Sequence, residues 1–169
     1  ATRINTKLYD YPIDYFPARK IMLPINKNEV IKAFGPVQLQ EDIIVDNMIW
    51  TIDKESLTKS DLMVLEIIRA NMWNKPICFS SVMNTNNYLG LEKYLYLEGL
   101  VYRLIPVETE ISVADPVNVN SYTMYVNFTQ NFKWGNLRES DIYYDENTRN
   151  SLINLRNHFS RLARGLYFA

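Results

Sequence analysis

Cysteine and histidine are almost absent from this sequence, which contains one of each. The single cysteine, Cys78, cannot form an internal disulfide, and the single histidine, His158, excludes a metal site built from several histidines. The 18 basic and 19 acidic residues give a net charge of −1, whereas nucleic-acid-binding domains are usually basic. No apolar run approaches the roughly 18 residues that span a bilayer, and no signal peptide opens the chain. We therefore expect no metal and no nucleic-acid partner.

What the chain does contain is enough apolar material for a packed core. Hydrophobic residues make up 47% and charged residues 22% of the 169 positions, a balance that is typical of globular proteins and excludes a disordered chain. The length suits a single domain over residues 1–169. Within it we expect an extended arm over 1–25, an α/β part over 26–110 and a helical part over 118–169.

The arm is predicted from its prolines and its aromatic residues. Each proline interrupts a helix and pushes the preceding residue towards extended geometry. The prolines are Pro12, Pro17 and Pro24. Packing of aromatic side chains, rather than hydrogen bonding, would hold the arm on the body. These aromatic residues are Tyr9, Tyr11, Tyr15 and Phe16, which could alternatively form an edge that faces a ligand.

A short helix and a β region are expected after the arm. Asn26 followed by Glu29 is a capping-box pattern, and a Gly-Pro pair supplies the stop, which gives a helix over 27–34. The apolar region 37–53 predicts a β-hairpin with its turn at the Asp-Asn pair 46–47, or else one long strand.

The clearest helix begins after Thr58, which forms a T-x-x-D cap with Asp61. The run that follows is apolar on almost every side, and such a helix is expected to be largely buried. Asn74 is expected to end it in the left-handed conformation, and Pro76 prevents the helix from resuming.

The middle of the chain predicts the sheet. Residues 77–82 are apolar enough for a strand that is buried on both faces, and 101–107 form another strand. A helix over 91–98 between them would give a right-handed β-α-β crossover that joins two parallel strands. The expected fold class is therefore α/β, or α+β, with a small mixed sheet flanked by helices.

Any ligand site is expected where this crossover leaves a crevice, at the carboxyl ends of the two strands. The candidate ligand-binding residues follow the first strand and are Ser81, Asn84, Asn86, Asn87 and Tyr88. Uncharged amides carry both donors and acceptors, which suits hydroxyl-rich or peptide ligands. The structural alternative is that Asn86 or Asn87 only caps the next helix.

The last third is expected to be helical. Four aromatic residues share one helical face, namely Tyr122, Tyr125, Phe128 and Phe132. The segment from Asp145 to Thr148 then caps a final helix, whose apolar stripe has spacings of three and four. The stripe contains Leu152, Leu155, Phe159, Leu162 and Leu166. Arg161 and Arg164 are expected on the opposite side of this helix.

No catalytic residue is assigned. His158 is expected at or near the surface without a catalytic role, and Cys78, inside an apolar strand, is expected to be inert packing. The motifs G-x-G-x-x-G and G-x-S-x-G and the Walker sequence do not occur, so we expect no cofactor. A charge in a strand needs a partner, and Glu98 and Glu66 are candidates for Arg103. We expect a structural ion pair of Arg103 with Glu98.

The aromatic residues allow one further alternative. The three tryptophans, Trp50, Trp73 and Trp134, and the tyrosines could stack against a sugar ring, whose hydroxyls asparagine side chains would bind. The same residue types are also what a core or a partner interface contains.

Three stretches of the sequence carry a resemblance to known proteins, namely Lys59–Val107, 131–136 and 144–165. The first two contain four motifs. They are W-x-x-P-I, N-Y-L-G-L, L-E-G-L-x-Y-R-L-I-P and F-K-W-G-N. Over most of residues 44–166 the chain resembles the soluble part of a family of large bacterial multi-pass membrane proteins of unknown function. The membrane half of that family is similar to GT-C-type glycosyltransferases, and its animal relatives are protein O-mannosyltransferases.

The resemblance implies an extracytoplasmic domain on the periplasmic face of the bacterial inner membrane, with the rest of its own membrane-embedded chain as partner. The catalytic carboxylates of such transferases belong to the membrane half, so none is carried over. We therefore expect a non-catalytic domain that binds a protein or glycan acceptor or holds another part of its own chain. The alternatives are a carbohydrate-binding module and an independent enzyme with its site at the carboxyl ends of strands 77–82 and 101–107.

Overall fold

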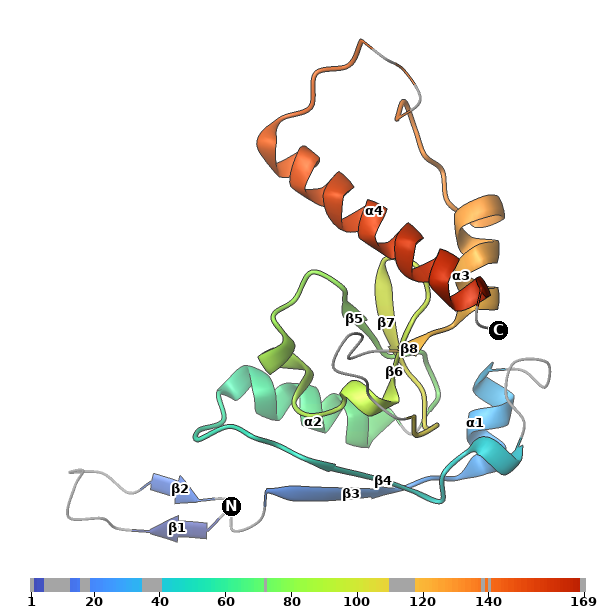
Figure 1. Ribbon diagram of the computed structural model, residues 1–169. Helices are drawn as coiled ribbons and strands as arrows, with labels where there is room; N and C mark the ends of the chain where they lie inside the picture. The colour runs from blue at the N-terminus through green and yellow to red at the C-terminus, as the bar shows by residue number, and fades with distance from the viewer. Residues whose placement is uncertain are drawn as a thin grey trace.

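The computed structural model describes residues 2–4, 13–15, 19–34, 41–71, 73–109, 118–137, 139 and 141–167. Within them, short strands and helices alternate along the first two thirds, and helices dominate the last third (Figure 1). The mixed α/β class and the helical C-terminal part that the sequence predicts are thereby confirmed. The described strands form two two-stranded ribbons and one four-stranded sheet.

The four-stranded sheet has the strand order β5-β7-β6-β8. The bounds are Cys78–Ser80 for β5, Leu95–Leu97 for β6, Val101–Leu104 for β7 and Asn118–Val119 for β8. Strand β7 pairs antiparallel with both β5 and β6, whereas β6 and β8 run parallel. The sheet is therefore mixed, as expected.

The expected right-handed β-α-β crossover is wrong. Cys78 of β5 lies opposite Arg103 of β7 in an antiparallel pair, whereas a crossover would have made the two strands parallel. Residues 91–98 do not form a helix, because only Glu92–Tyr94 make a 3₁₀ turn before β6 begins. Both leucines of β6 are buried and Tyr96 between them is half-buried, so the residues follow the two-residue period of a strand.

A ribbon of two strands pairs β3, Lys20–Pro24, with β4, Asn47–Thr51, in antiparallel register. The hairpin expected within 37–53 is wrong, and so is the single long strand, because β4 pairs with the arm and Glu41–Ile43 form a 3₁₀ turn. The hydrogen bonds between β3 and β4 therefore hold the last residues of the arm. The sequence had predicted that packing alone would hold the arm.

The start of the arm forms a second ribbon, in which β1, Thr2–Ile4, pairs antiparallel with β2, Ile13–Tyr15. The aromatic side chains that were expected to dock the arm lie outside the described part of the structure. They are those of Tyr9, Tyr11, Tyr15 and Phe16.

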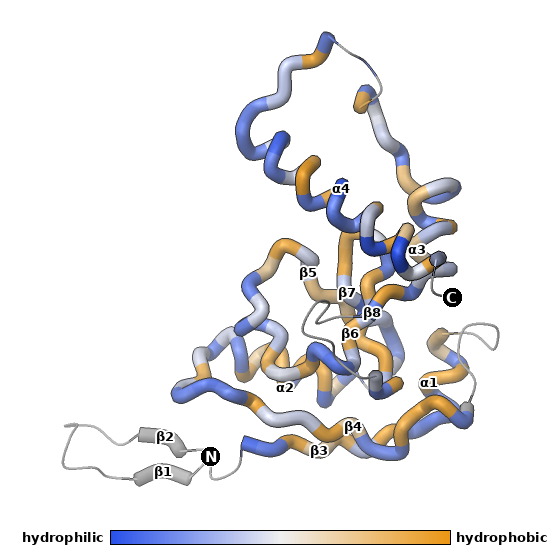
Figure 2. Tube along the Cα trace, viewed as in Figure 1, coloured by the Kyte–Doolittle hydropathy of each residue, from blue (hydrophilic) through white to orange (hydrophobic). Residues whose placement is uncertain are grey.

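The core joins the four-stranded sheet to the β3–β4 ribbon, and apolar residues concentrate on both (Figure 2). The side chains with the least exposure are Val30, Met48, Leu91, Tyr94, Leu95, Leu97, Leu104 and Met124. The Tyr94 hydroxyl accepts a hydrogen bond from the Ile49 N–H at 2.9 Å and donates one to the Ile49 carbonyl at 3.3 Å. A buried phenol thereby satisfies its polar end and ties β4 to the segment before β6.

The first two α-helices have the expected beginnings. Helix α1 covers Lys27–Phe34, and Asn26 caps it by accepting a hydrogen bond from the Asn28 N–H at 3.2 Å. Helix α2 covers Lys59–Asn71 and begins after the Thr58 cap. The helix over 27–34 and the cap at Thr58 are therefore confirmed.

Two expectations about α2 are wrong. The helix is not largely buried, because Met63 and Ile67 are 64% and 54% exposed. Trp73, and not Asn74, adopts the left-handed conformation after the helix, with φ 66°. This conformation accompanies burial of the Trp73 ring, whose centroid lies 6.4 Å from that of Phe34.

Strand β5, at an edge of the sheet, buries only one of its two faces, so the prediction of a strand buried on both faces is wrong. Phe79 is buried, whereas Cys78 and Ser80 are exposed. Cys78 is therefore not part of the core packing.

The last third contains α3, Ser121–Val126, a π-helical turn, Asn127–Asn131, and α4, Glu146–Tyr167. In Figure 1 both α-helices lie on the side of the sheet away from the β3–β4 ribbon. Asp145 caps α4, as predicted, by accepting a hydrogen bond from the Thr148 N–H at 2.8 Å.

The four aromatic residues that were expected to share one helical face do not do so. Tyr122 and Tyr125 are exposed, whereas Phe128 is buried. The α-helix changes to π geometry at Asn127, and Phe132 follows the π turn in an extended conformation, so the four residues do not keep one α-helical spacing.

Candidate functional site

The turn between β6 and β7 is fixed by side chains from three other segments. The Glu98 carbonyl accepts a hydrogen bond from Asn127 Nδ2 at 2.6 Å, and the Leu100 carbonyl accepts one from Ser81 Oγ at 2.9 Å. His158 of α4 is buried beside the backbone of Gly99, which lies between them. The turn is thus the place where the sheet and the helical third are joined.

The carboxylate of Glu98 points away from bulk solvent, with its side chain only 10% exposed. Its Oε1 accepts a hydrogen bond from Asn120 Nδ2 at 3.1 Å, and its Oε2 lies 3.5 Å from Arg103 Nη1. Burial raises the pKa of the Glu98 carboxyl, and the charge of Arg103 and the Asn120 amide oppose that rise. Asn120 also caps α3 by accepting a hydrogen bond from the Thr123 N–H at 3.2 Å.

Arg103 completes this cluster on the side of α1. Its guanidinium carbon lies 4.0 Å from the centre of the Phe34 ring, a cation–π geometry. The other candidate partner, Glu66, instead forms two hydrogen bonds with Arg69, at 2.5 and 2.8 Å. The structure therefore brings Arg103 and Glu98 together and places Glu66 in a different pair.

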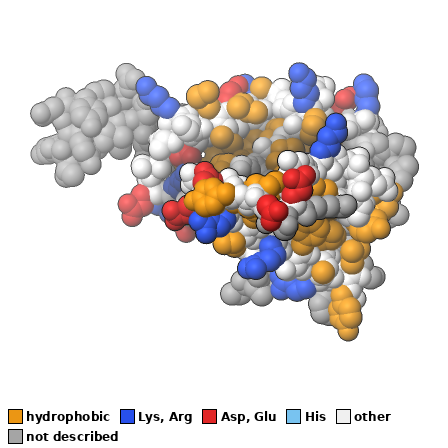
Figure 3. Space-filling model, turned by 90° about the horizontal axis from the view of Figure 1, so that it is seen from above, with side chains coloured by type: hydrophobic (Ala, Val, Ile, Leu, Met, Phe, Trp, Pro, Cys, Tyr) orange, Lys and Arg blue, Asp and Glu red, His pale blue; other side chains and the backbone are white. Residues whose placement is uncertain are grey.

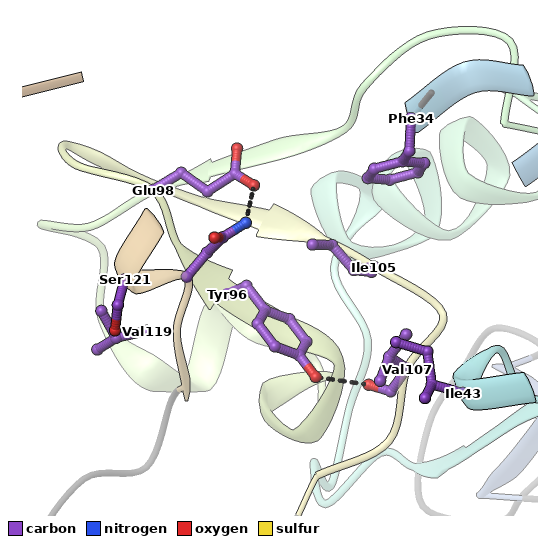
Figure 4. A pocket seen from close by; sticks show the side chains of 9 residues that line it. Phe34, Ile43, Tyr96, Glu98, Ile105, Val107, Val119 and Ser121 are labelled. Carbon is purple, nitrogen blue, oxygen red and sulfur yellow. Dashed lines mark hydrogen bonds between the residues drawn. The ribbon is translucent and has the colours of Figure 1, made fainter. Parts of the chain in front are cut away.

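A pocket of about 260 Å³ opens beside Glu98. Its polar lining consists of Tyr96, Glu98, Asn120 and Ser121. Its apolar lining consists of Phe34, Ile43, Ile105, Val107 and Val119. Figure 4 shows Tyr96 in the middle, with Glu98 and Ser121 to one side and Val107 and Ile43 to the other. The pocket therefore has a polar end and an apolar end.

The ligand site predicted from the sequence lies in the segment after β5, and no residue of that segment lines this pocket. Asn84 Oδ1 accepts a hydrogen bond from the Asn86 N–H at 3.0 Å and so caps the 3₁₀ turn Thr85–Tyr88, while Asn86 and Asn87 are exposed. The cap is thus Asn84, whereas the structural alternative named Asn86 or Asn87. The crevice that motivated this site depended on a parallel crossover, which is absent between β5 and β7, and ligand binding by these residues stays a prediction.

The two ends of this predicted site already serve the fold. Ser81 holds the Leu100 carbonyl. Tyr88 is buried, and its one O–H is shared between the carbonyls of Ser80 at 3.2 Å and Met83 at 3.4 Å. Burial raises the pKa of Tyr88 to about 12. The phenol is therefore protonated at neutral pH and acts as a structural donor.

His158 is buried, with 6% of its surface exposed, so the expected surface or boundary position is wrong. Burial, and then the charge of Arg161, lower the pKa of the imidazole, while the neighbouring Gly99 backbone raises it. Arg161 is likewise not on the outer side of α4, because its Nη1 donates a hydrogen bond to the Tyr102 hydroxyl at 2.8 Å. Both polar residues, His158 and Arg161, therefore lie on the side of α4 that packs against the sheet.

Among the described residues, Cys78 is not an activated nucleophile and no cluster suits a metal ion. Desolvation raises the pKa of the Cys78 thiol, so the reactive thiolate is disfavoured. Within the described ranges, no three His, Cys, Asp or Glu residues are placed to hold a metal ion. No helix in the described part of the chain is both long and apolar enough to cross a membrane.

Sequence reasoning missed Tyr96, Asn120 and Ser121 as pocket residues. An asparagine before a helix is a recognisable N-cap, so Asn120 could have been found as a cap. The contact of Asn120 with Glu98 could not have been predicted, because the two residues come together only when β6 and β8 pair.

Comparison of the chain with known proteins gives one family match. Neither the curated proteins nor the solved structures contain a match to it. The model of the family described as TMEM260-associated domain 2 matches residues 2–123, which is more than half of the chain. The chain therefore belongs to the TMEM260-associated domain 2 family.

Proposed function

We propose that this chain is a non-catalytic accessory domain of a larger, membrane-associated, glycosyltransferase-like protein, and that it docks against another part of that protein. The family match supports a role beside a membrane protein. The resemblance of the Lys59–Val107 region to bacterial multi-pass proteins supports a location on the extracytoplasmic, periplasmic side. Sugar transfer would belong to the membrane half of that parent protein.

The observation that carries this proposal is the uncovered side of α2. Leu62, Met63 and Ile67, here called the α2 face, are 38%, 64% and 54% exposed. Met63 and Ile67, four positions apart, lie on the same side of the helix, and Leu62 borders that side. A helix that is apolar on nearly all sides is expected to be largely buried. Of the apolar residues of α2, only Ile68 is buried in the described chain.

The chemistry of the α2 face favours a protein segment of the same parent as its occupant. Two charged neighbours on this side, Glu66 and Arg69, pair with each other, and Lys59 adds one positive charge at the start of the helix, so little net charge surrounds the face. Elsewhere the surface is mixed, as Figure 3 shows for one side of the molecule, where acidic, basic and apolar side chains are interspersed. An acceptor polypeptide is the competing occupant.

Photo-cross-linking in the full-length membrane protein tests this proposal. A benzophenone amino acid at Met63 is expected to form cross-links within the same polypeptide, identified by mass spectrometry of the linked peptides. The matched control carries the probe at Tyr143, which is 85% exposed and lies outside α2. Cross-links from Met63 to a separate polypeptide would contradict docking within the parent, and a yield no higher than that of the control would contradict docking by α2 altogether.

A further inference from the structure

The pocket beside Glu98 has a polar end that is electrically balanced. The Glu98 carboxylate is nine-tenths buried and faces the Arg103 guanidinium at 3.5 Å, so the two charges largely cancel. A charged ligand would add an uncompensated charge to a half-enclosed site, which is costly. The ligand that suits this pocket is therefore neutral.

The same end offers hydrogen bonds that hydroxyl groups can use. A carboxylate has about four acceptor positions, and the described contacts of Glu98 occupy one on each oxygen. Ser121 places a hydroxyl, which can both donate and accept, on the same side of Tyr96 as Glu98 (Figure 4). Acceptors and a hydroxyl that line the same pocket match a ligand that carries several hydroxyl groups.

The rest of the pocket is apolar and includes two aromatic rings. Tyr96 and Phe34 contribute their rings, and Ile105 and Val107 contribute aliphatic surface. The volume of about 260 Å³ is below the roughly 300–1,000 Å³ of sites for drug-sized ligands, so it suits a single ring. A pyranose has this pairing of a hydroxyl edge with an apolar C–H face.

We infer that this pocket binds one neutral saccharide ring, with its hydroxyls on Glu98 and Ser121 and its apolar face towards Tyr96. This inference goes beyond the proposed docking role and uses a different part of the molecule, since none of the pocket residues belongs to α2. An apolar peptide side chain is the competing ligand, because Ile105 and Val107 would also accept it.

Methyl-detected NMR of the 169-residue chain provides the test. The probes are methyl glycosides of glucose, galactose and mannose, and N-acetylvaline amide as the peptide mimic. At least one glycoside is expected to shift the methyl signals of Ile105 and Val119 saturably. Ile43 is 46% exposed and lines the pocket, so Ile43→Trp fills the pocket without touching the Glu98 cluster and should weaken binding at least about tenfold.

The control variant is Val82→Trp, which adds the same ring at a residue that is 68% exposed and does not line the pocket. It should bind the glycoside as the unmodified chain does. Shifts caused by N-acetylvaline amide but by no glycoside would overturn the saccharide assignment in favour of a peptide. No saturable shift with any probe, or equal binding by Ile43→Trp, would overturn the site. None of these outcomes affects the cross-linking test of α2.

Discussion

His158, in the final helix, is buried beside the backbone of Gly99 in the turn between β6 and β7. The carbonyls on either side of Gly99 are held by Asn127 and Ser81. One tight turn thus collects contacts from the π-helical segment, from α4 and from the end of β5. This arrangement couples the stability of the helical third to the protonation state of the one histidine.

The first prediction concerns the pH dependence of stability. Burial and Arg161 lower the pKa of His158 in the folded chain below its ordinary value of 6.5. The folded state therefore binds the proton less well than the unfolded state, and the His158 contribution is complete above pH 6.5 and lost as the pH falls through the folded value. Urea unfolding at a series of pH values should show a smaller loss of stability on acidification for His158→Gln than for the unmodified chain.

The pKa shift of Glu98 has the opposite direction, so its effect on the pH dependence of stability must be separated from that of His158. Its pKa is raised above 4.5, so its contribution is complete below pH 4.5 and is lost as the pH rises through the folded value. The test is therefore the difference in the pH dependence of stability between the unmodified chain and His158→Gln, and not the curve of either chain alone. Parallel curves for the unmodified chain and His158→Gln would show that His158 titrates equally in the folded and unfolded states.

The second prediction concerns the Glu98–Arg103 pair. Glu98→Gln leaves a largely buried guanidinium that cannot lose its proton, and breaking a buried pair in this way should cost about 3–5 kcal/mol. Arg103→Met leaves a carboxyl whose pKa is already raised and which can become neutral, so the loss should be about 1–3 kcal/mol. Urea unfolding near neutral pH measures both.

The same experiment at lower pH provides the control. Acidification should reduce the deficit of Arg103→Met, because protonation removes the charge of Glu98, and should leave the deficit of Glu98→Gln in place. A larger loss for Arg103→Met than for Glu98→Gln at neutral pH would contradict this description of the pair.

The sequence predicted the helix caps well because a cap involves residues within one turn. Asn26, Thr58 and Asp145 each accept a hydrogen bond from an N–H two or three residues later, as their spacing indicates. The ion pair of Arg103 with Glu98 was also within reach, because both residues flank the same short turn and a charge in a strand requires a partner.

Strand pairing and the pocket were out of reach for the opposite reason. Strand β4 pairs with β3, although the whole of α1 lies between them in the sequence. A turn motif at 46–47 gives no information about a strand partner that far away along the chain. The residues 91–98 have a helical composition, yet the pairing of Leu95–Leu97 with both β7 and β8 overrides that preference. Tyr96, Asn120 and Ser121 meet only after these pairings form.

The third prediction tests the cap of α2. Asp61 is buried, and its carboxylate accepts hydrogen bonds from Lys54 Nζ at 2.8 Å and from the Thr58 N–H and Oγ1 at 2.9 Å. Thr58→Ala should cost about 1 kcal/mol, as loss of an N-cap usually does. Asp61→Asn should cost more, because it also removes the charge that pairs with Lys54. Thermal unfolding compares the two, and equal losses would contradict a role for Lys54.

This cap also has a defined pH window. The hydrogen bond from Lys54 is the largest cause that lowers the pKa of Asp61 below 3.8, and burial opposes it. The contribution is therefore complete above pH 3.8 and is lost as the pH falls through the folded value. Asp61→Asn should remove this part of the acid sensitivity, whereas Thr58→Ala should keep most of it.

The last prediction compares two glycines that both have positive φ. A Cβ added at Gly90, where φ is 81°, would collide with the backbone carbonyl oxygen of Thr51, whereas one added at Gly135, where φ is 55°, would meet nothing within 4 Å. Gly135→Ala should therefore cost only the strain of the left-handed conformation, about 1–2 kcal/mol. Gly90→Ala should cost that strain plus about 1–3 kcal/mol for displacing β4, because a backbone carbonyl cannot swing aside as a side chain can. Urea unfolding of the two variants gives the difference directly, and equal losses would mean that β4 does not pack against Gly90 as closely as the structure shows.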